Sequence, residues 1–433
     1  DGNLSTWHQV YDLCNTGFLS NTSYHRLEGR DASGNRVTEM PVYINIDNLI
    51  DYMLIVFYTG NFDAPTSAFR QNKNCNNFYA IRNRKNPSRG FVFLVHDAEH
   101  TLMAEDIYPG IGLYEDRVNL ATREDAFRME LYGFENFHPQ WLHYRLTANA
   151  DYRMRVADRA FRLLQPGNAL SPEAGLTRFN QRTAEAEEAI VAESARWGDA
   201  GRSFAYTRDD AWMHEINEVR NDFLPYRSDI LRDQLKAADL YPEIEPPVIR
   251  VSGIEVVSAW YPFNQAVSVS VSRPSQNGTI YYTLNNSDPR LPGGQINPLA
   301  LTSTQAVTLN LTASTALKAR MYSNGTWSAL NHINFLGQAD DYSALKVTEL
   351  MVNPNDHINS GDTLKGSSLE FIEFKNAGSS FLNLSGFMLD SAVHATFPEN
   401  TLLAPGEFLV AASKPFAFSS VYGREPTINY SGN

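Results

Sequence analysis

This 433-residue sequence has little cysteine, no long apolar run and no surplus of basic residues. Its 2 cysteines, Cys14 and Cys75, exclude a disulfide-stapled scaffold and leave open either one bridge or two free thiols. No apolar run reaches the roughly 18 residues that a membrane span needs. The net charge of −13 gives no broad surface that could neutralise phosphates, so we expect no nucleic-acid partner.

The composition is that of a globular protein with several domains. Hydrophobic residues make up 43% of the chain and charged residues 20%, so disorder is not the default. A chain of this length is sufficient for two to four domains, each with its own core. The residue pattern changes near residues 245 and 340. We therefore predict a multidomain α+β protein with regions at 1–245, 248–337 and 340–433.

Residues 1 to 245 read mainly as helix. Asp47 is predicted to cap an apolar, buried helix that runs through Phe57. Ser171-Pro172-Glu173 is a typical helix start with Pro at the first helical position. A further helix is predicted over roughly 209 to 238, and Pro246-Pro247 marks a linker.

The remaining residues have strand patterns. In the 248–337 region, alternating runs such as AVSVSVSR and TIYYTLN are separated by turn clusters, which predicts a small antiparallel β-sandwich. The 340–433 region is again β, with LKVTELMVN, LEFIEFKNAG and EFLVAA as strands. It stops at TINYSGN without an evident final element, so we expect this last region to be truncated.

The stretch FVFLVHDAEHTL, residues 91 to 102, matches the inverted zinc-protease pattern H-x-x-E-H. Histidines four apart share one face of a helix, whereas on a strand they are separated by about 13 Å, too far to bind one ion. Five apolar, strand-type residues precede His96, and Pro109 leaves little room for a helix after His100. We favour a strand end at His96 and a partly exposed His100, with zinc as the alternative.

An acid, an amide and a second acid follow one another in the order that protein kinases use. Asp63 follows the predicted buried helix, and Asn77 lies further along a polar loop, just before the predicted strand FYAIRN. Asp97 directly follows the predicted strand FVFLV. In protein kinases the first acid accepts the proton of the substrate hydroxyl, and the amide and second acid hold Mg²⁺ against the phosphates. Oxygen ligands of this kind suit Mg²⁺. The order alone is a weak signal, because Asp and Asn are common in loops.

The segments YINIDNLIDYMLIVFYTGNFD, NNFYAIRN and GFVFLVHDAEHTL resemble the large lobe of the CotH-type (spore coat protein H) kinase family. The likeness continues to FLPYRSDILRDQLKAADLYP and covers roughly residues 1 to 245. Members of this family are secreted or surface-associated atypical protein kinases that use ATP and a divalent metal. The resemblance implies that Asp63 is the catalytic aspartate and that Asn77 and Asp97 hold Mg²⁺ or Mn²⁺ for phosphotransfer to Ser/Thr hydroxyls of a protein substrate.

The sequence departs from the family pattern at two motif positions and at its start. The Trp of the family's W-D-x-D motif is His96 here, and its second acid is Glu99, which we retain as a weaker metal-site candidate. Only about 60 residues precede Asp63, and no strand-borne lysine is evident among them. We therefore expect a fragment without the nucleotide-binding small lobe, inactive by itself. The alternative is a non-catalytic surface or matrix adhesion scaffold built on a degenerate kinase-like lobe.

The two β regions resemble known accessory modules. VSVSRPSQNGTIYYTLNNSDPR and TALKARMYSNGTWS are similar to the chitobiase/β-hexosaminidase C-terminal domain, and LEFIEFKNAG with FPENTLLAPGEFLVAAS to the lamin-tail domain. Both resemblances imply immunoglobulin-like β-sandwiches. In bacteria such modules occur on exported proteins, which implies a secreted or cell-surface location. We expect them to act as spacers more than as carbohydrate or matrix binders, although Trp327 and Tyr281 could stack on a sugar if exposed.

Overall fold

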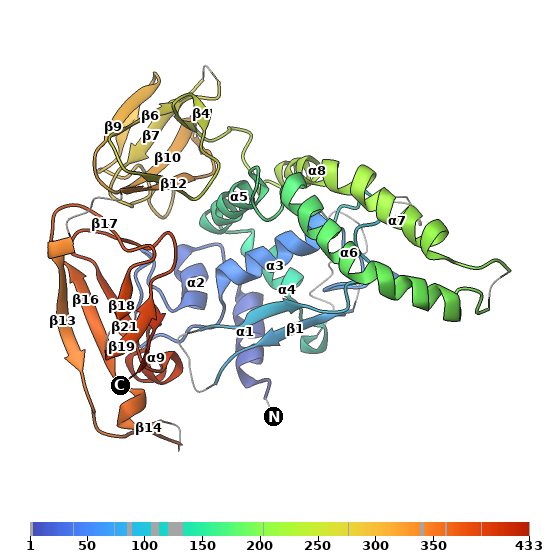
Figure 1. The fold of residues 1–433 in the computed structure, drawn as a ribbon, viewed down its shortest axis with the longest axis horizontal. Helices are drawn as coiled ribbons and strands as arrows, with labels where there is room; N and C mark the ends of the chain where they lie inside the picture. Colours follow the sequence, from blue (N-terminus) through green and yellow to red (C-terminus); the bar gives the residue numbers. More distant parts are fainter. Residues whose placement is uncertain are drawn as a thin grey trace. The chain divides into compact units, whose positions relative to one another are not determined.

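The computed structural model describes residues 3–37, 39–72, 74–84, 89–104, 112–119, 133–201, 203–275, 277–337, 342–359, 362–390 and 392–432. The chain splits into two compact units, and each contains segments that are far apart in the sequence. Unit 1 comprises Asp1–Leu19, Ile46–Ala80 and Phe93–Tyr241, and unit 2 comprises Ser20–Asn45, Ile81–Val92 and Pro242–Asn433. The helical elements of unit 1 and the β-rich part of unit 2 agree with the predicted multidomain α+β class (Figure 1).

Unit 1 is mainly helical. Its helical elements are α1 (Ser5–Thr16), α3 (Ile46–Thr59), η2 (Ala68–Arg70), η5 (Phe134–Asn136), α4 (Pro139–Leu146), α5 (Ala150–Leu164), α6 (Pro172–Trp197), η6 (Arg208–Trp212), α7 (Met213–Glu218), η7 (Val219–Phe223) and α8 (Leu224–Ala237). Strands β1 (Phe78–Ile81) and β2 (Val92–Val95) pair in a two-stranded sheet. These two strands were predicted from the runs FYAIRN and FVFLV.

Helix α3 is the buried helix that the apolar run predicted. Nine of its side chains are buried, among them Leu49, Met53 and Phe57. The predicted N-cap is wrong, because the helix begins at Ile46 and Asp47 already lies in its first turn. Asp47 instead accepts a hydrogen bond from Arg155 of α5 at 2.7 Å, so its carboxylate joins two helices.

Helix α6 starts where Ser171 predicted. The Ser171 hydroxyl accepts a hydrogen bond from the backbone N–H of Ala174, and Pro172 occupies the first turn. Of the residues in α6, Gly175 is the buried one, so most of this 26-residue helix presents side chains to solvent. The helix predicted over 209 to 238 is present as η6, α7, η7 and α8, in which η6 and η7 are π-helical turns. Helix α6 runs along this succession in an extended hairpin (Figure 1).

Residues 248 to 337 of unit 2 form two sheets around one core. The strands are β3 (Val248–Val251), β4 (Ile254–Glu255), β5 (Trp260–Phe263), β6 (Val267–Ser272), β7 (Thr279–Thr283), β8 (Leu301–Ser303), β9 (Val307–Leu311), β10 (Thr315–Ser323), β11 (Thr326–Trp327) and β12 (Asn331–Gly337). One sheet has the order β4-β3-β6-β9 and the other β5-β12-β10-β7-β8, with β11 on β10. Val269 and Val271 of β6 and Phe335 of β12 belong to the same buried cluster, so the two sheets pack face to face.

The two motifs quoted from this region contact each other in the fold. Asp288, from the NNSDP turn, accepts two hydrogen bonds from Arg320 of β10, at 2.8 and 2.6 Å. Arg320 is only 1% exposed and also donates to the Ser328 carbonyl. Trp327 is 4% exposed and packs against Tyr281 and Tyr322, so it is a core residue and not an exposed platform for a sugar.

Residues 342 to 432 form several short sheets. The elements are η8 (Tyr342–Ala344), β13 (Leu345–Met351), β14 (His357–Asn359), β15 (Asp362–Leu364), η9 (Gly366–Ser368), β16 (Phe371–Asn376), β17 (Leu382–Asn383), β18 (Met388–Asp390), β19 (Val393–Thr396), β20 (Leu402–Leu403), β21 (Phe408–Ala412), α9 (Pro415–Tyr422), β22 (Ile428–Asn429) and β23 (Ser431–Gly432). The sheets have the orders β13-β16-β21-β22, β18-β19-β23, β14-β15 and β17-β20. The stretch TINYSGN, for which the sequence predicted no element, contains β22 and β23.

The segment Ser20–Asn45 of unit 2 contains α2 (Asn21–His25) and η1 (Arg26–Glu28).

Both cysteines are free thiols: Cys14 of α1 is buried and Cys75 is half-buried. Burial raises the pKa of Cys14 to about 12, and the charge of Arg145 opposes this rise by a smaller amount. Across the described residues, no helix combines the length and apolarity needed to cross a bilayer.

Candidate active site

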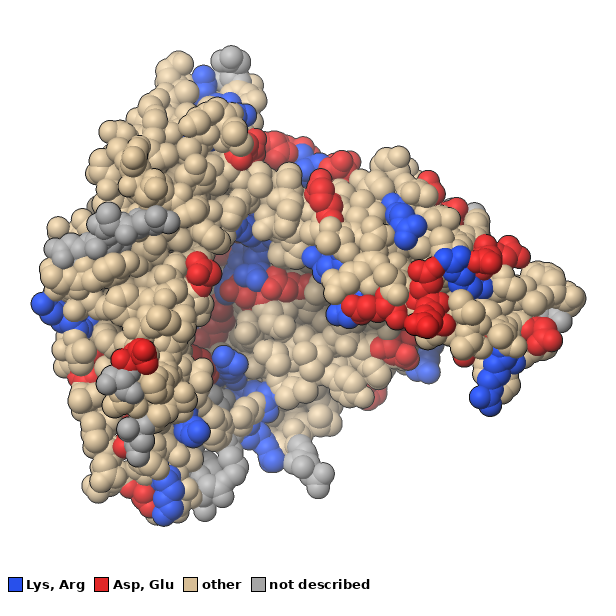
Figure 2. All heavy atoms as spheres, viewed as in Figure 1, with Lys and Arg blue, Asp and Glu red and all other residues tan. Residues whose placement is uncertain are grey.

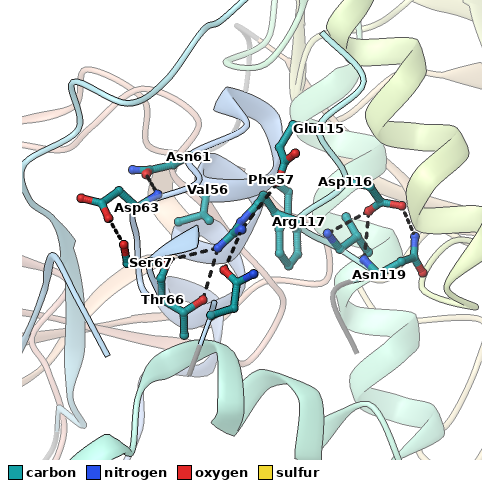
Figure 3. A network of polar contacts seen from close by, with 12 residues as sticks. Val56, Phe57, Asn61, Asp63, Thr66, Ser67, Glu115, Asp116, Arg117 and Asn119 are labelled. Atoms are coloured by element: carbon teal, nitrogen blue, oxygen red, sulfur yellow. Dashed lines mark hydrogen bonds and ion pairs between the residues drawn. The ribbon is translucent and has the colours of Figure 1, made fainter. Parts of the chain in front are cut away.

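The candidate site begins at the C-terminal end of α3. Gly60 ends the helix with a φ of 61°, a left-handed conformation that glycine adopts without steric cost. Asn61 then turns back, and its backbone N–H donates to the Val56 carbonyl at 3.0 Å. The Asn61 side chain is 1% exposed, and its oxygen accepts from the backbone N–H of Asp63 at 3.0 Å (Figure 3). Asn61 therefore fixes the backbone on which Asp63 is carried.

Both carboxylate oxygens of Asp63 accept a side-chain hydrogen bond. The Ser67 hydroxyl donates to Oδ1, and the Asn77 amide donates to Oδ2 at 2.8 Å. Asn76, the neighbour of Asn77, donates its amide to the Asp63 carbonyl at 3.1 Å. Asp63 is 8% exposed, and these donors hold its carboxylate in one orientation.

The predicted amide and second acid both have left-handed backbone. Asn77 has a φ of 45° and Asp97 a φ of 50°, a region that Asn and Asp adopt more readily than other residues with a Cβ. Since the Asn77 amide nitrogen donates to Asp63, its amide oxygen is the atom of this side chain that can coordinate a cation.

Strand β2 leads into the segment of Asp97 and is fixed to α3. The Asn48 side chain accepts from the Phe93 N–H at 2.5 Å and donates to the Phe93 carbonyl at 3.3 Å, so one amide anchors the strand. Asp97 and Glu99 follow β2 in irregular, exposed backbone. Glu99 is near the His100 ring, with 3.7 Å between Oε1 and Nε2. The structure thus brings Asp63 and Asn77 into direct contact. Asp97 and Glu99 lie on the adjoining segment, and within the described residues no hydrogen bond joins either acid to Asp63 or Asn77.

The two histidines flank Asp97 and hold its segment in place. His96 stacks on Tyr79 of β1, two residues after Asn77, with ring centroids 4.8 Å apart. His100 packs against Phe62, the neighbour of Asp63, at 5.1 Å. The segment is also anchored by the Leu102 N–H, which donates to the Thr59 carbonyl at 2.8 Å.

The zinc alternative has no support in the structure. Residues 96 to 99 are not helical, so His96 and His100 do not share a helix face. Within the described part of the chain, no group of three or more His, Cys, Asp or Glu side chains is arranged to hold a metal ion. The rings that suggested zinc serve as packing groups on either side of Asp97.

The buried Arg117 stabilises the loop that follows Asp63. Arg117 is 0% exposed and donates to the Thr66 carbonyl and hydroxyl at 3.1 and 3.2 Å, and to Asn72 at 3.0 Å (Figure 3). Its charge is balanced by Glu115, which is 1% exposed, with 3.5 Å between Nη1 and Oε1. Together these contacts tie the 112–119 segment to the loop between Asp63 and Asn77.

A second buried arginine fixes the end of α3. Arg227 of α8 donates to the carbonyls of Phe57, Tyr58, Leu113 and Glu115. Burial lowers the pKa of Arg227 to about 10, and the nearby acids Asp116 and Glu115 oppose that shift. Neither arginine was predicted. The one available signal was that Arg227 lies four and eight residues before Leu231 and Leu235, on the apolar face of α8.

The donor set suits a divalent metal bound together with a nucleotide. Mg²⁺ is usually held by one or two protein oxygen ligands while phosphates and waters complete its shell. The amide oxygen of Asn77 and the exposed carboxylate of Asp97 provide that number, and Glu99 lies two residues further on.

Comparison with known proteins bears on this site directly. Residues 28–231 match the family model described as CotH kinase protein. The match spans Asp63, Asn77, Asp97 and Glu99, and we call this stretch the CotH-like region. It supports the predicted CotH resemblance and a kinase-like fold there, while the resemblances of the two later regions stay predictions.

Two other comparisons add little. No curated protein matches the chain. Among solved structures, the sulfur carrier protein SoxY from Chlorobium limicola f thiosulfatophilum is similar at 10% identity, covering 23% of this chain and 90% of SoxY, with a TM-score of 0.14. A similarity at that level supports no conclusion about fold or function.

Proposed function

We propose that the CotH-like region is the large lobe of an exported protein kinase that transfers the γ-phosphate of ATP to Ser/Thr hydroxyls of secreted or surface proteins. The observation that carries this proposal is the hydrogen bond from Asn77 to Asp63. It joins the two residues that the kinase order assigns to the substrate hydroxyl and to the metal. The family match over residues 28–231 supports the same assignment.

Each site residue has a role that follows from its contacts. Asp63 accepts the proton of the substrate hydroxyl, and Ser67 and Asn77 hold its carboxylate in the required orientation. The Asn77 amide oxygen and the Asp97 carboxylate would hold Mg²⁺ or Mn²⁺, with Glu99 as the weaker candidate. The bound metal would neutralise charge on the nucleotide phosphates. The arginines Arg117 and Arg227 keep the Asp63 loop and the end of α3 rigid.

For the β-rich part of unit 2, we propose two accessory modules with immunoglobulin-like sandwiches. Residues 248–337 correspond to a chitobiase/β-hexosaminidase C-terminal-like module, and residues 340–433 to a lamin-tail-like module. The Asp288–Arg320 pair supports the first, because it joins the two segments that carry the resemblance. The burial of Trp327 favours a spacer role at a bacterial surface or matrix over sugar binding.

Binding calorimetry with Mg²⁺ and a non-hydrolysable ATP analogue tests the kinase proposal. We expect saturable binding by the wild-type chain and at least a tenfold loss of affinity in Asp97→Ala. Asp116→Asn is a suitable control, because Asp116 lies in the same unit and bonds to Val118 and Asn119 instead of the site. No detectable binding by the wild-type chain would overturn the proposal and favour a non-catalytic scaffold.

A further inference from the structure

The helical hairpin of unit 1 contains a cavity that the kinase proposal does not use. It has a volume of about 540 Å³ and lies between the C-terminal end of α6 and the elements η6 and α7. Three aromatic side chains and two carboxylates are prominent in its lining: Trp197, Tyr206, Trp212, Glu193 and Glu215. A cavity of this size suits a small-molecule ligand.

The aromatic lining is more exposed than ordinary core residues would be. Trp197 is 51% exposed and Tyr206 46% exposed. The backbone near these residues is joined by a hydrogen bond from the Tyr206 N–H to the Gly198 carbonyl at 2.9 Å. A Cβ at Gly198 would approach the Tyr206 carbonyl oxygen to 2.5 Å, so this close crossing requires glycine. Exposed aromatic side chains that lie together are common in binding sites.

The opposite wall is formed by η6, a π-helical turn over Arg208–Trp212. Thr207 caps it by accepting the Asp210 N–H at 3.2 Å. Trp212 of this turn lines the cavity together with Trp197 of α6.

The charge of the cavity is negative. Glu193 comes from α6 and Glu215 from α7, and within the described residues neither carboxylate has a hydrogen bond or an ion pair. Two cations lie nearby: Arg208 pairs with Glu187 and Asp209, and Arg196 lies over the ring of Trp197, which lines the cavity, at 4.9 Å from the ring centroid. Acidic side chains, with basic ones among them, gather on the surface of this helical hairpin (Figure 2).

We propose that this cavity binds a small organic cation that carries an alkylammonium group. Aromatic faces attract such a cation through their π-electrons, and two carboxylates compensate its charge. The guanidinium of the neighbouring Arg196 lies 4.9 Å from the centroid of the Trp197 ring, within the distance at which a cation and an aromatic face attract each other. An anion would be repelled by Glu193 and Glu215, and no described cluster of side chains provides the ligand set for a metal ion.

Choline and its neutral isostere 3,3-dimethylbutan-1-ol test the proposal on the full chain. The two probes have the same shape, so the charge alone distinguishes them. We expect saturable binding of choline, followed by tryptophan fluorescence and calorimetry, and at least tenfold weaker binding of the alcohol. Equal binding of both probes, or no saturation with choline at millimolar concentration, would overturn the proposal.

Variants assign the effect to the cavity. We expect Glu193→Gln with Glu215→Gln to weaken choline binding at least tenfold, and Trp197→Leu to weaken it as well. Glu188→Gln is the matched control, because Glu188 is an exposed carboxylate on the same helix that does not line the cavity. If the double variant and the control bind choline equally well, the site is not this cavity and the proposal is wrong.

Discussion

Asn77 donates its amide hydrogen to the Asp63 carboxylate at 2.8 Å, across 14 positions of sequence. The contact joins the loop after α3 to the start of β1, and so the candidate base and the candidate metal ligand hold each other in place. Because the donor is the amide nitrogen, the amide oxygen stays available for a cation. An Asp at position 77 could not donate this hydrogen bond, and its carboxylate would repel that of Asp63, so Asn suits the position better.

Replacing Asn77 with Leu should loosen the Asp63 loop. The change removes the donor to Oδ2 of a carboxylate that is 8% exposed, and a hydrogen bond to an ionised group contributes about 1.5–3 kcal/mol. Hydrogen exchange of peptides that cover residues 61 to 70 should therefore be at least tenfold faster. Asn74→Ala is the control, since the Asn74 amide makes an exposed hydrogen bond to Asn136. Equal exchange in both variants would show that the bond to Asp63 contributes nothing.

His96 is expected to tolerate another aromatic ring but not its removal. The ring stacks on Tyr79 at 4.8 Å, and aromatic pairs contribute about 0.5–1.5 kcal/mol beyond buried area. His96→Ala should speed exchange across residues 96 to 102 by about threefold to tenfold. His96→Trp, the residue in the family motif, should leave it near wild type. The stacking role is wrong if the two variants behave alike.

Asp288→Asn should destabilise the first sandwich of unit 2. Burial opposes ionisation of Asp288, but the hydrogen bonds and charge of Arg320 outweigh it and lower the pKa of this carboxyl. Because Arg320 is 1% exposed, loss of its partner charge should cost about 3 kcal/mol. Hydrogen exchange of β7 and β10 peptides measures the loss. Glu255→Gln, which breaks an exposed pair with Arg250 at 3.9 Å, should change the same peptides by less than about 0.5 kcal/mol.

Helix α4 should become less stable as the pH falls below about 6.5. Burial and the charge of Arg117 lower the pKa of His138 to about 3, and burial lowers that of His143 to about 3. Between pH 6.5 and 3 the unfolded chain binds protons that the folded chain does not, so the free energy of unfolding decreases with falling pH. Each histidine contributes a slope of up to about 1.4 kcal/mol per pH unit.

His138→Asn separates the titration from the structural role of this residue. The His138 ring accepts the Trp141 N–H at 3.1 Å and so caps α4, and Asn is also a good N-cap. The variant should retain α4 protection at pH 7 and show a smaller loss at pH 5, by hydrogen exchange corrected for intrinsic rates. An unchanged pH dependence would contradict the role of His138.

Local signals in the sequence predicted several elements correctly. Ser171-Pro172 marks the start of α6, and the apolar runs at 78–81 and 92–95 are β1 and β2. These signals depend on neighbours in sequence, which one sequence displays. The cap assigned to Asp47 failed because α3 begins one residue earlier, at Ile46. The Asp47 carboxylate pairs with the distant Arg155 instead, a partner that no local pattern reveals.

The candidate site was predictable in part. The order of Asp63, Asn77 and Asp97 identified these residues as candidates. It did not predict that Asn77 contacts Asp63, or that His96 and His100 pack against aromatic rings on either side of Asp97. Arg117 and Arg227 were missed because their partners are mostly backbone carbonyls and Thr or Asn side chains, which have no sequence signature. Trp327 was considered as a possible exposed platform because the aromatic contacts that bury it come from other strands.

Paramagnetic Mn²⁺ in the presence of a non-hydrolysable ATP analogue gives the most direct test of the kinase-like site. Water-proton relaxation or electron paramagnetic resonance reports bound Mn²⁺ without requiring turnover. We predict nucleotide-dependent Mn²⁺ binding by the wild-type chain. The affinity should be at least tenfold weaker in Asp97→Ala and Asn77→Leu, and it should fall by a smaller factor in Glu99→Gln. Equal Mn²⁺ binding by the wild type and Asp97→Ala would contradict this prediction.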